Sequence, residues 1–255
     1  MGYVRDYDYR TKQKADFRAT RRVEQLLSRQ LRKIAQHIGM VVEGIADGTL
    51  ESAVKIGELM ARYAETLVPW AEASLRRIHQ EIDSRDKRQW RVYSREIGEL
   101  LRDEINKTDT GTVLRGLMSE QVSLIRSLPL EAAQRVHELT LRALSEGERK
   151  DEIVADIMRT GDVTRSRAVL IARTETARTA SLLTQTRAQA VGSTHYVWRT
   201  ARDAGVRPSH RRLEGKSFPW NEPPVCDPPA HRANPGQIWN CRCWAEPVIP
   251  RRQRQ

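Results

Sequence analysis

The sequence has few cysteines, few aromatic residues and no long apolar run, and these shortages exclude several classes of protein. Only three of the 255 residues are cysteine, and all three follow position 225, so any disulfide scheme leaves one thiol unpaired. This number favours a reducing compartment or a metal site over a disulfide-stapled secreted domain. No apolar segment approaches the roughly 20 residues that span a bilayer. We expect no transmembrane helix and, because the first residues lack an apolar stretch, no secretory signal.

Basic residues outnumber acidic ones, which points to an acidic partner. The chain has 44 Lys and Arg against 33 Asp and Glu, a formal net charge of +11. Residues 191–255 carry 11 basic and 5 acidic side chains, so more than half of the excess lies in a quarter of the chain. Because no base-reading motif is present, we expect non-specific contact with the phosphates of double-stranded DNA.

Particular arginines are candidates for that contact. An alternative is a solvated helix face with local ion pairs, such as Glu175 with Arg178. The candidates for nucleic-acid contact are Arg165, Arg167, Arg178 and Arg187 within a predicted long helix, and Arg251, Arg252 and Arg254 near the last residue.

The composition changes near Gly192. Nine of the eleven prolines, four of the six tryptophans and all the cysteines follow Val191. Before this point, apolar residues recur at spacings of three and four, which predicts helices. The expected fold is mainly α with a small C-terminal α+β module, divided into a helical region at 1–130 and a domain at 131–255. Within the second domain, 194–255 forms the module of short strands and a proline-rich loop.

Breakers and caps divide the helical region. Residues 23–38 form an amphipathic helix with a basic outer face. Pro69 and Pro129 are each predicted to end one helix and begin the next. A short helix ending at Gly161 and an N-cap at Thr164 would precede the long helix, from Arg165 to about Ala190. A separate helix is marked by Trp90, Ile97, Leu100, Leu101 and Ile105.

The module has two candidate strands and a long irregular segment between them. Residues 194–200 are β-branched and aromatic, and residues 241–248 offer a second strand. The segment 203–240 is rich in proline, glycine and polar residues, so a compact module needs a tether to hold it.

A structural zinc ion is one interpretation of that tether. Cys241 and Cys243 can place two thiolates on one cation, and His210 with Cys226 would complete the four donors of a tetrahedral site. The alternative is that these thiols are simply small buried side chains.

A catalytic interpretation rests on Asp203, His210 and Asn240, which a nuclease or transferase could gather around one cleft. Such residues beside glycine and proline more often form turn and loop hydrogen bonds. Because the sequence contains no nucleophile elbow, no phosphate-binding loop and no H-E-x-x-H motif, we expect a protein that is not an enzyme. A zinc-dependent nuclease or other nucleic-acid-processing enzyme is the leading alternative, and a plain DNA-binding protein is a third.

Several short motifs follow one another between residues 165 and 248. R-A-V-L-I-A-R-T-E-T-A-R at 167–178 is followed by W-R-T at 198–200, and N-C-R-C at 240–243 closes the series. In this order and spacing they resemble the phage head morphogenesis domain, the family of phage Mu F-like minor head proteins. The residues that match the family motifs are Arg173, Glu175, Trp198, Asp203, Arg207, His210, Gly215, Asn240, Cys241, Arg242 and Cys243.

The resemblance implies a role in building the phage head. It implies a minor capsid protein, made in the host cytoplasm, that lies in the capsid interior near the portal and affects the packaged DNA. In such a protein the helical region at 1–130 would dock on the portal or capsid, and 131–255 would be the head morphogenesis domain. Its partners would be the portal protein, the capsid interior and double-stranded DNA, with no membrane involved. The resemblance does not imply catalysis.

Overall fold

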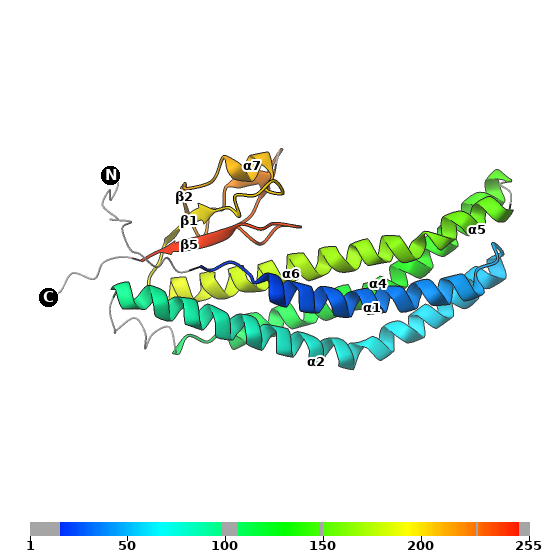
Figure 1. Ribbon diagram of the computed structural model, residues 1–255, viewed down its shortest axis with the longest axis horizontal. Coiled ribbons are helices and arrows are strands. Elements are labelled where there is room, and N and C mark those ends of the chain that lie inside the picture. Colours follow the sequence, from blue (N-terminus) through cyan, green and yellow to red (C-terminus); the bar gives the residue numbers. More distant parts are fainter. Residues whose placement is uncertain (1–15, 98–106, 148–149, 228, 250–255) are drawn as a thin grey trace.

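The computed structural model describes residues 16–97, 107–147, 150–227 and 229–249. Four long helices lie side by side in an elongated bundle, and a small β module sits beside α6 near one end (Figure 1). The elements are α1 (Arg21–Ile45), α2 (Leu50–Ile97), α4 (Gly111–Glu146), α5 (Lys150–Met158), α6 (Thr160–Ala190), β1 (His195–Arg199), α7 (Pro208–Arg211), β2 (Ser217–Pro219), β3 (Val225–Asp227), β4 (His231–Arg232) and β5 (Trp244–Val248). This confirms the predicted fold class of a mainly helical protein with a small C-terminal α+β module.

The bundle is built from two tight helix pairs. Helix α1 packs mainly on α6, and α2 packs mainly on α4. Gly39 and Gly161 allow α1 and α6 to approach closely, because a Cβ added to Gly161 would lie 3.3 Å from the Gly39 Cα. The bundle core is apolar and includes Leu31, Ile56 and Val136, each fully buried. None of the helices in the described ranges is long and apolar enough to cross a membrane.

Neither proline ends a helix, so the predicted breaks at Pro69 and Pro129 are wrong. Helix α2 runs from Leu50 through Pro69 to Ile97, and α4 contains Pro129. An internal proline costs about 3 kcal/mol through a lost hydrogen bond and a steric clash. Core residues lie close to each proline, among them Ala71 and Leu128, and their burial offsets that cost.

The start of α6 also differs from the prediction. The helix begins at Thr160, so Gly161 and Thr164 lie inside it. The Thr164 hydroxyl donates to the Thr160 carbonyl at 2.8 Å instead of capping the helix. Trp90 and Ile97 belong to α2 and form no separate helix, while Leu100, Leu101 and Ile105 lie outside the described residues.

The module contains a three-stranded antiparallel sheet of order β2-β1-β5. His195 pairs with Val248 and Arg199 with Trp244, so the two predicted strands are neighbours. The segment between them is less irregular than expected. It contains the short helix α7, strand β2 and a small β3-β4 ribbon.

The module shares its apolar core with the bundle. Phe17 and Trp90 belong to the same buried cluster as Tyr196 and Trp198 of β1. The Tyr93 hydroxyl on α2 donates to the Pro247 carbonyl at 2.6 Å. The bundle therefore supplies part of the module's interior.

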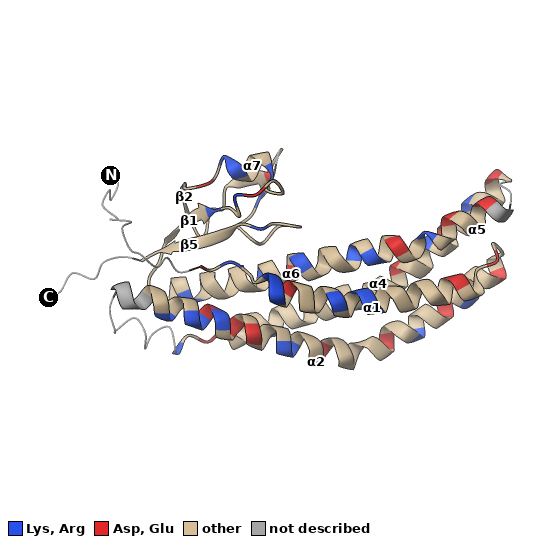
Figure 2. Ribbon diagram, in the orientation of Figure 1, with Lys and Arg blue, Asp and Glu red and all other residues tan. Residues whose placement is uncertain are grey.

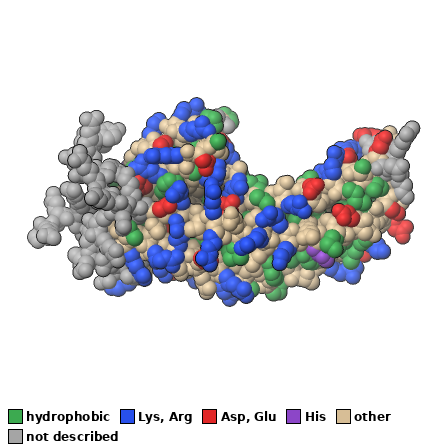
Figure 3. Space-filling model, in the orientation of Figure 1, with side chains coloured by type: hydrophobic (Ala, Val, Ile, Leu, Met, Phe, Trp, Pro, Cys, Tyr) green, Lys and Arg blue, Asp and Glu red, His purple; other side chains and the backbone are tan. Residues whose placement is uncertain are grey.

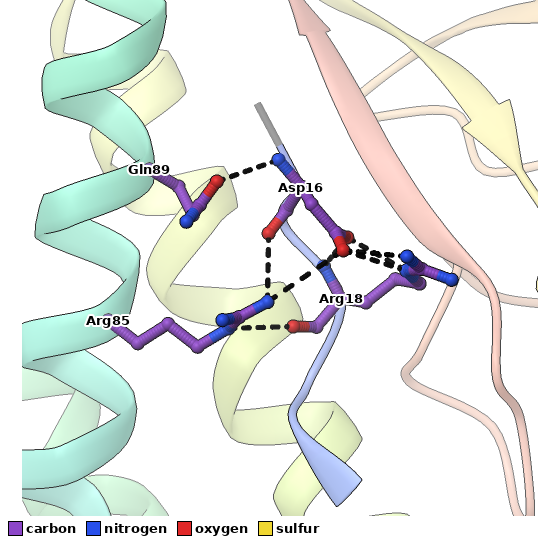
Figure 4. A network of polar contacts seen from close by, with 4 residues as sticks. All are labelled: Asp16, Arg18, Arg85 and Gln89. Atoms are coloured by element: carbon purple, nitrogen blue, oxygen red, sulfur yellow. Dashed lines mark hydrogen bonds and ion pairs between the residues drawn. The ribbon is translucent and has the colours of Figure 1, made fainter. Parts of the chain in front are cut away.

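The segment before α1 runs between α2 and β5. Figure 4 shows the Asp16 amide donating to Gln89 Oε1 at 2.8 Å, and the Asp16 carboxylate receiving the Arg18 guanidinium. Arg85 donates to the Arg18 carbonyl at 3.2 Å. The Arg18 guanidinium also lies 4.9 Å from the centroid of the Trp244 ring. These contacts fasten the segment to α2 and to the edge strand β5.

Candidate functional site

Two cysteines and one histidine meet in the interior of the module. His210, Cys241 and Cys243 are 1%, 2% and 6% exposed, and one donor atom from each lies within 4.8 Å of the others. His210 Nδ1 is 3.6 Å from Cys241 Sγ and 3.5 Å from Cys243 Sγ. Three of the four predicted metal-ligand candidates are therefore brought together, and we call them the His210 cluster.

Local backbone structure holds each member of the His210 cluster. His210 lies in α7, which begins at Pro208, a residue suited to a first helical turn. The two cysteines follow Asn240, whose φ of 56° is in the left-handed region that asparagine tolerates better than most residues. The backbone N–H of Asn240 donates to the Thr174 hydroxyl at 3.1 Å, which fixes the turn to α6.

Backbone amides surround the Cys241 sulfur. The amides of Gly236 and Cys243 both donate to Cys241 Sγ at 3.4 Å. Gly236 has a φ of +86°, and an added Cβ would lie 3.1 Å from Ser181 Cβ, so only glycine fits without a shift. Two N–H donors directed at one sulfur stabilise the thiolate form.

The ionisation of the cluster is strongly perturbed. The hydrogen bond with Cys243 and the nearby His210 lower the pKa of Cys241 well below its usual value. The same sharing of a proton, together with burial, raises the pKa of Cys243. Burial would lower the pKa of His210, but the Cys226 and Cys241 side chains outweigh it and raise that pKa to about 9. The pKa shifts of Cys241 and His210 have one cause in common, because a thiolate and an imidazolium side by side stabilise each other.

Cys226 is near this cluster but is not one of its three mutually close donors. It is fully buried on β3, and its thiol donates to the His231 carbonyl at 3.6 Å. The Cys226 side chain also raises the pKa of His210. The predicted four-donor set is thus represented by three close donors and one neighbour.

Other family-motif residues build the walls of the module. Trp198 is fully buried, and its ring lies edge-on to the His210 ring at 5.3 Å. Arg242 donates to Asp203 Oδ1 at 2.7 Å. Arg207 donates to the Trp239 carbonyl at 2.9 Å.

Two further motif residues hold the module, one from within and one against the bundle. Gly215 has a φ of +77°, and its backbone amide donates to the Trp198 carbonyl of the same module at 2.9 Å. Arg173 on α6 pairs with Glu24 of α1 at 3.0 Å and donates to Asn240 Oδ1 at 2.7 Å. The Arg173 contacts tie the N-C-R-C turn to two helices at once.

Glu175 belongs to a buried polar chain inside the bundle. Gln121 donates through its side-chain nitrogen to Glu175 Oε2 and to the Thr179 hydroxyl, each at 3.1 Å. Its oxygen lies 2.7 Å from His79 Nε2. Burial raises the pKa of Glu175 and lowers the pKa of His79. This chain links α2, α4 and α6.

Arg187 is not available for nucleic-acid contact, which corrects the prediction made for it. Its side chain is completely buried and pairs with Asp86 and, at 2.5 Å, with Asp83 Oδ1, both on α2. Hydrogen bonds from Lys87 and Arg187 lower the pKa of Asp83 although burial opposes them, whereas burial raises the pKa of Asp86. The arginine therefore serves the packing of α6 on α2.

The other candidate arginines lie at the surface in different degrees. Arg165 is the most exposed, with 59% of its side chain accessible, and it lies 4.0 Å from Asp162. Arg167 pairs with Glu131 at 2.6 Å. Arg178 pairs with Glu120 at 2.6 Å and lies 3.8 Å from Glu175, as the sequence suggested. Arg251, Arg252 and Arg254 lie outside the described residues.

A basic surface on α1 was not among the candidate sites, although its helix was predicted to have a basic outer face. Figure 2 marks the Lys and Arg positions along this helix, and Figure 3 shows basic side chains on the face of the molecule that also carries basic groups of the module. We call it the α1 basic face. Its exposed residues are Arg21, Arg22, Arg29, Arg32 and Lys33.

The fold and the His210 cluster define a helical-bundle protein with a small β module packed around buried thiols. Residues 134–246 match the family model described as Phage Mu protein F like protein, which confirms the predicted resemblance over this part of the chain. The match begins within α4 and ends in β5, so it includes the His210 cluster and every family-motif residue.

One relative comes from Haemophilus influenzae and is described as an uncharacterized protein. It is 29% identical over 171 residues, which cover 67% of this chain and 36% of the relative. The chain thus spans about a third of that relative's length. No solved structure matches the chain.

Proposed function

We propose that this protein is a phage minor head protein that acts in head morphogenesis, associates with the portal and contacts the packaged DNA inside the capsid. The observation that carries the proposal is the match of residues 134–246 to the phage Mu F-like family. The motif residues in that region hold the module on α6, as the Arg173 contacts with Glu24 and Asn240 illustrate. The motifs are therefore used in the architecture of the protein, as expected for a structural component.

The burial of the His210 cluster supports a non-enzymatic role over the nuclease alternative. A phosphodiester must reach a catalytic group directly, and His210 is only 1% exposed. Asp203 and Asn240 are occupied by the guanidinium groups of Arg242 and Arg173. The three residues that suggested catalysis thus make structural contacts.

The α1 basic face supports the proposed contact with DNA. Its five exposed cations lie on one helix. Arg22 pairs with Glu81 at 3.6 Å, and the Arg22 side chain is 87% exposed in that pair. Exposed pairs of this kind contribute about 0–1 kcal/mol, so phosphates can replace the carboxylate at little cost. Such contacts hold DNA without reading its sequence.

Head assembly from purified or co-expressed phage proteins tests the proposal. The full chain is co-expressed with the portal and capsid proteins of the same phage, and assembled heads are isolated by sedimentation. We expect the chain to sediment with heads that contain portal and not with heads assembled without it. The Arg173→Ala variant, which breaks the link between α6 and the N-C-R-C turn, should be incorporated into heads less than wild type. Arg62→Ala, at an exposed position of α2, should behave as wild type. Absence of the wild-type chain from portal-containing heads would refute the proposal.

A further inference from the structure

We propose that His210 Nδ1, Cys241 Sγ and Cys243 Sγ bind one structural zinc ion inside the module. Neither the family match nor the proposed role in head morphogenesis assigns a metal to these residues. The inference rests on the arrangement of the donor atoms, on the groups that surround them, and on the charge that the site must carry.

The distances agree with donors that share one ion. Bond lengths of about 2.3 Å to sulfur and 2.0–2.1 Å to nitrogen, at tetrahedral angles, place the nitrogen about 3.5–3.6 Å from each sulfur. His210 Nδ1 lies 3.6 and 3.5 Å from the two sulfurs. A ring nitrogen has one lone pair or one proton and can form only one good hydrogen bond. Two sulfurs at nearly equal distances from Nδ1 are better explained by one metal ion bound between the three donors.

The surroundings of the sulfurs suit a metal thiolate. Cys241 Sγ receives the amides of Gly236 and Cys243, both at 3.4 Å. Amides that donate to a coordinating sulfur orient it and stabilise its negative charge. Two thiolates and a divalent cation also give a site without net charge, which reduces the cost of burial. Two sulfurs with one imidazole favour zinc over calcium or magnesium, which prefer oxygen.

The cluster can be reached by a small ion. A cavity of about 580 Å³ lies between the N-terminal segment, α6 and β5, and both cysteines line it together with Asp203 and Trp244. Cys226 lies beside the imidazole of His210 but outside the three close donors. We therefore assign it a supporting position next to the histidine and not a place in the donor set, so that a water molecule would complete the four ligands of a tetrahedral ion.

Metal content and cobalt absorption test the proposal on the full chain. Protein expressed with added zinc and purified without chelators should contain about one zinc ion per chain, as a single shared site requires. After the zinc is removed, added cobalt should give a thiolate-to-cobalt charge-transfer absorption with the intensity of two thiolates. Excess zinc should abolish it, because zinc has the higher affinity for such sites.

Cysteine variants identify the donors. Cys241→Ser and Cys243→Ser should each remove about half of the cobalt charge-transfer intensity and weaken zinc binding more than about tenfold, since even outer contacts affect affinity 10–100-fold. Cys226→Ser is the matched control, a buried cysteine of the same module, and should retain the full intensity. If a variant fails to fold, the wild-type cobalt titration and its reversal by zinc still decide the matter. Zinc-free wild type that gives no cobalt spectrum would overturn the proposal, as would an equal loss of intensity in Cys226→Ser.

Discussion

The buried ion pairs of Arg187 allow a sharp test of how α6 is held in the bundle. Arg187 is completely buried, and its guanidinium meets Asp86 and Asp83 of α2. The Thr184 hydroxyl donates to Asp86 Oδ1 at 2.6 Å. Replacement of Arg187 by Met keeps a long apolar side chain and removes only the positive charge.

The expected loss follows from what the substitution leaves behind. Asp86 is 5% exposed and would keep one hydroxyl partner in place of a cation. Removing one partner of a buried pair costs about 3–5 kcal/mol. For a chain of this size each kcal/mol lowers the melting temperature by about 2–4 °C, so Arg187→Met should melt roughly 6–20 °C below wild type.

The pH dependence of this loss has a definite sign. Burial already raises the pKa of Asp86, and the loss of the arginine would raise it further. A carboxyl whose pKa is higher in the folded state binds protons on folding, so its stabilising contribution is present at low pH and disappears as the pH rises. The deficit of Arg187→Met should therefore be smaller near pH 4 than at pH 7.

Thermal and urea unfolding measure the effect against a control on the same helix. Arg167→Met removes an arginine that pairs with Glu131 but is 35% exposed, so the loss should not exceed about 1 kcal/mol. The double variant Arg187→Met with Asp86→Asn should recover part of the stability, because it also removes the unpaired carboxylate. If Arg187→Met unfolds no more easily than Arg167→Met, the assigned role of the buried pair is wrong.

Three further outcomes are expected. DNA binding should be indifferent to sequence and steeply salt-dependent. Replacing the cations of the α1 basic face by glutamine should flatten the slope of log K against log salt by roughly 0.9 per lost phosphate contact, which fluorescence anisotropy can measure. Gly236→Ala should cost about 1–3 kcal/mol in a thermal melt because of its positive φ and close neighbours, whereas Gly116→Ala on α4, where nothing lies within 4 Å of an added Cβ, should stabilise the chain. Burial lowers the pKa of His79 from 6.5, so its contribution to stability is complete above pH 6.5 and is lost as the pH falls. His79→Gln should therefore reduce the slope of unfolding free energy against pH between pH 5 and 7, and an unchanged slope would contradict this.

Local patterns predicted the elements that depend on local interactions. The amphipathic helix at 23–38 lies within α1, where Thr20 provides the N-cap by accepting from the Val23 amide. The β-branched and aromatic segment at 194–200 contains β1. The breaks at Pro69 and Pro129 were wrong because the cost of an internal proline is local, whereas the burial that offsets it comes from other helices.

Contacts between distant residues could be predicted only in part. The sequence could predict that His210, Cys241 and Cys243 lie close together, because the module contains few other side chains that can bind a soft cation. Arg187 carried no such signal. Its partner Asp86 lies 101 residues away, and a basic residue on a helix is usually solvated, so sequence reasoning placed it at the surface.

The shared core also bears on where the chain divides into domains. The predicted boundary at 130/131 falls inside α4, which is continuous from Gly111 to Glu146. The module buries Trp90 of α2 and Phe17 of the N-terminal segment together with its own Trp198. A module of about 60 residues gains little from its own interior, and these borrowed aromatic side chains enlarge its core. The bundle and module therefore stabilise each other, and we expect them to unfold together.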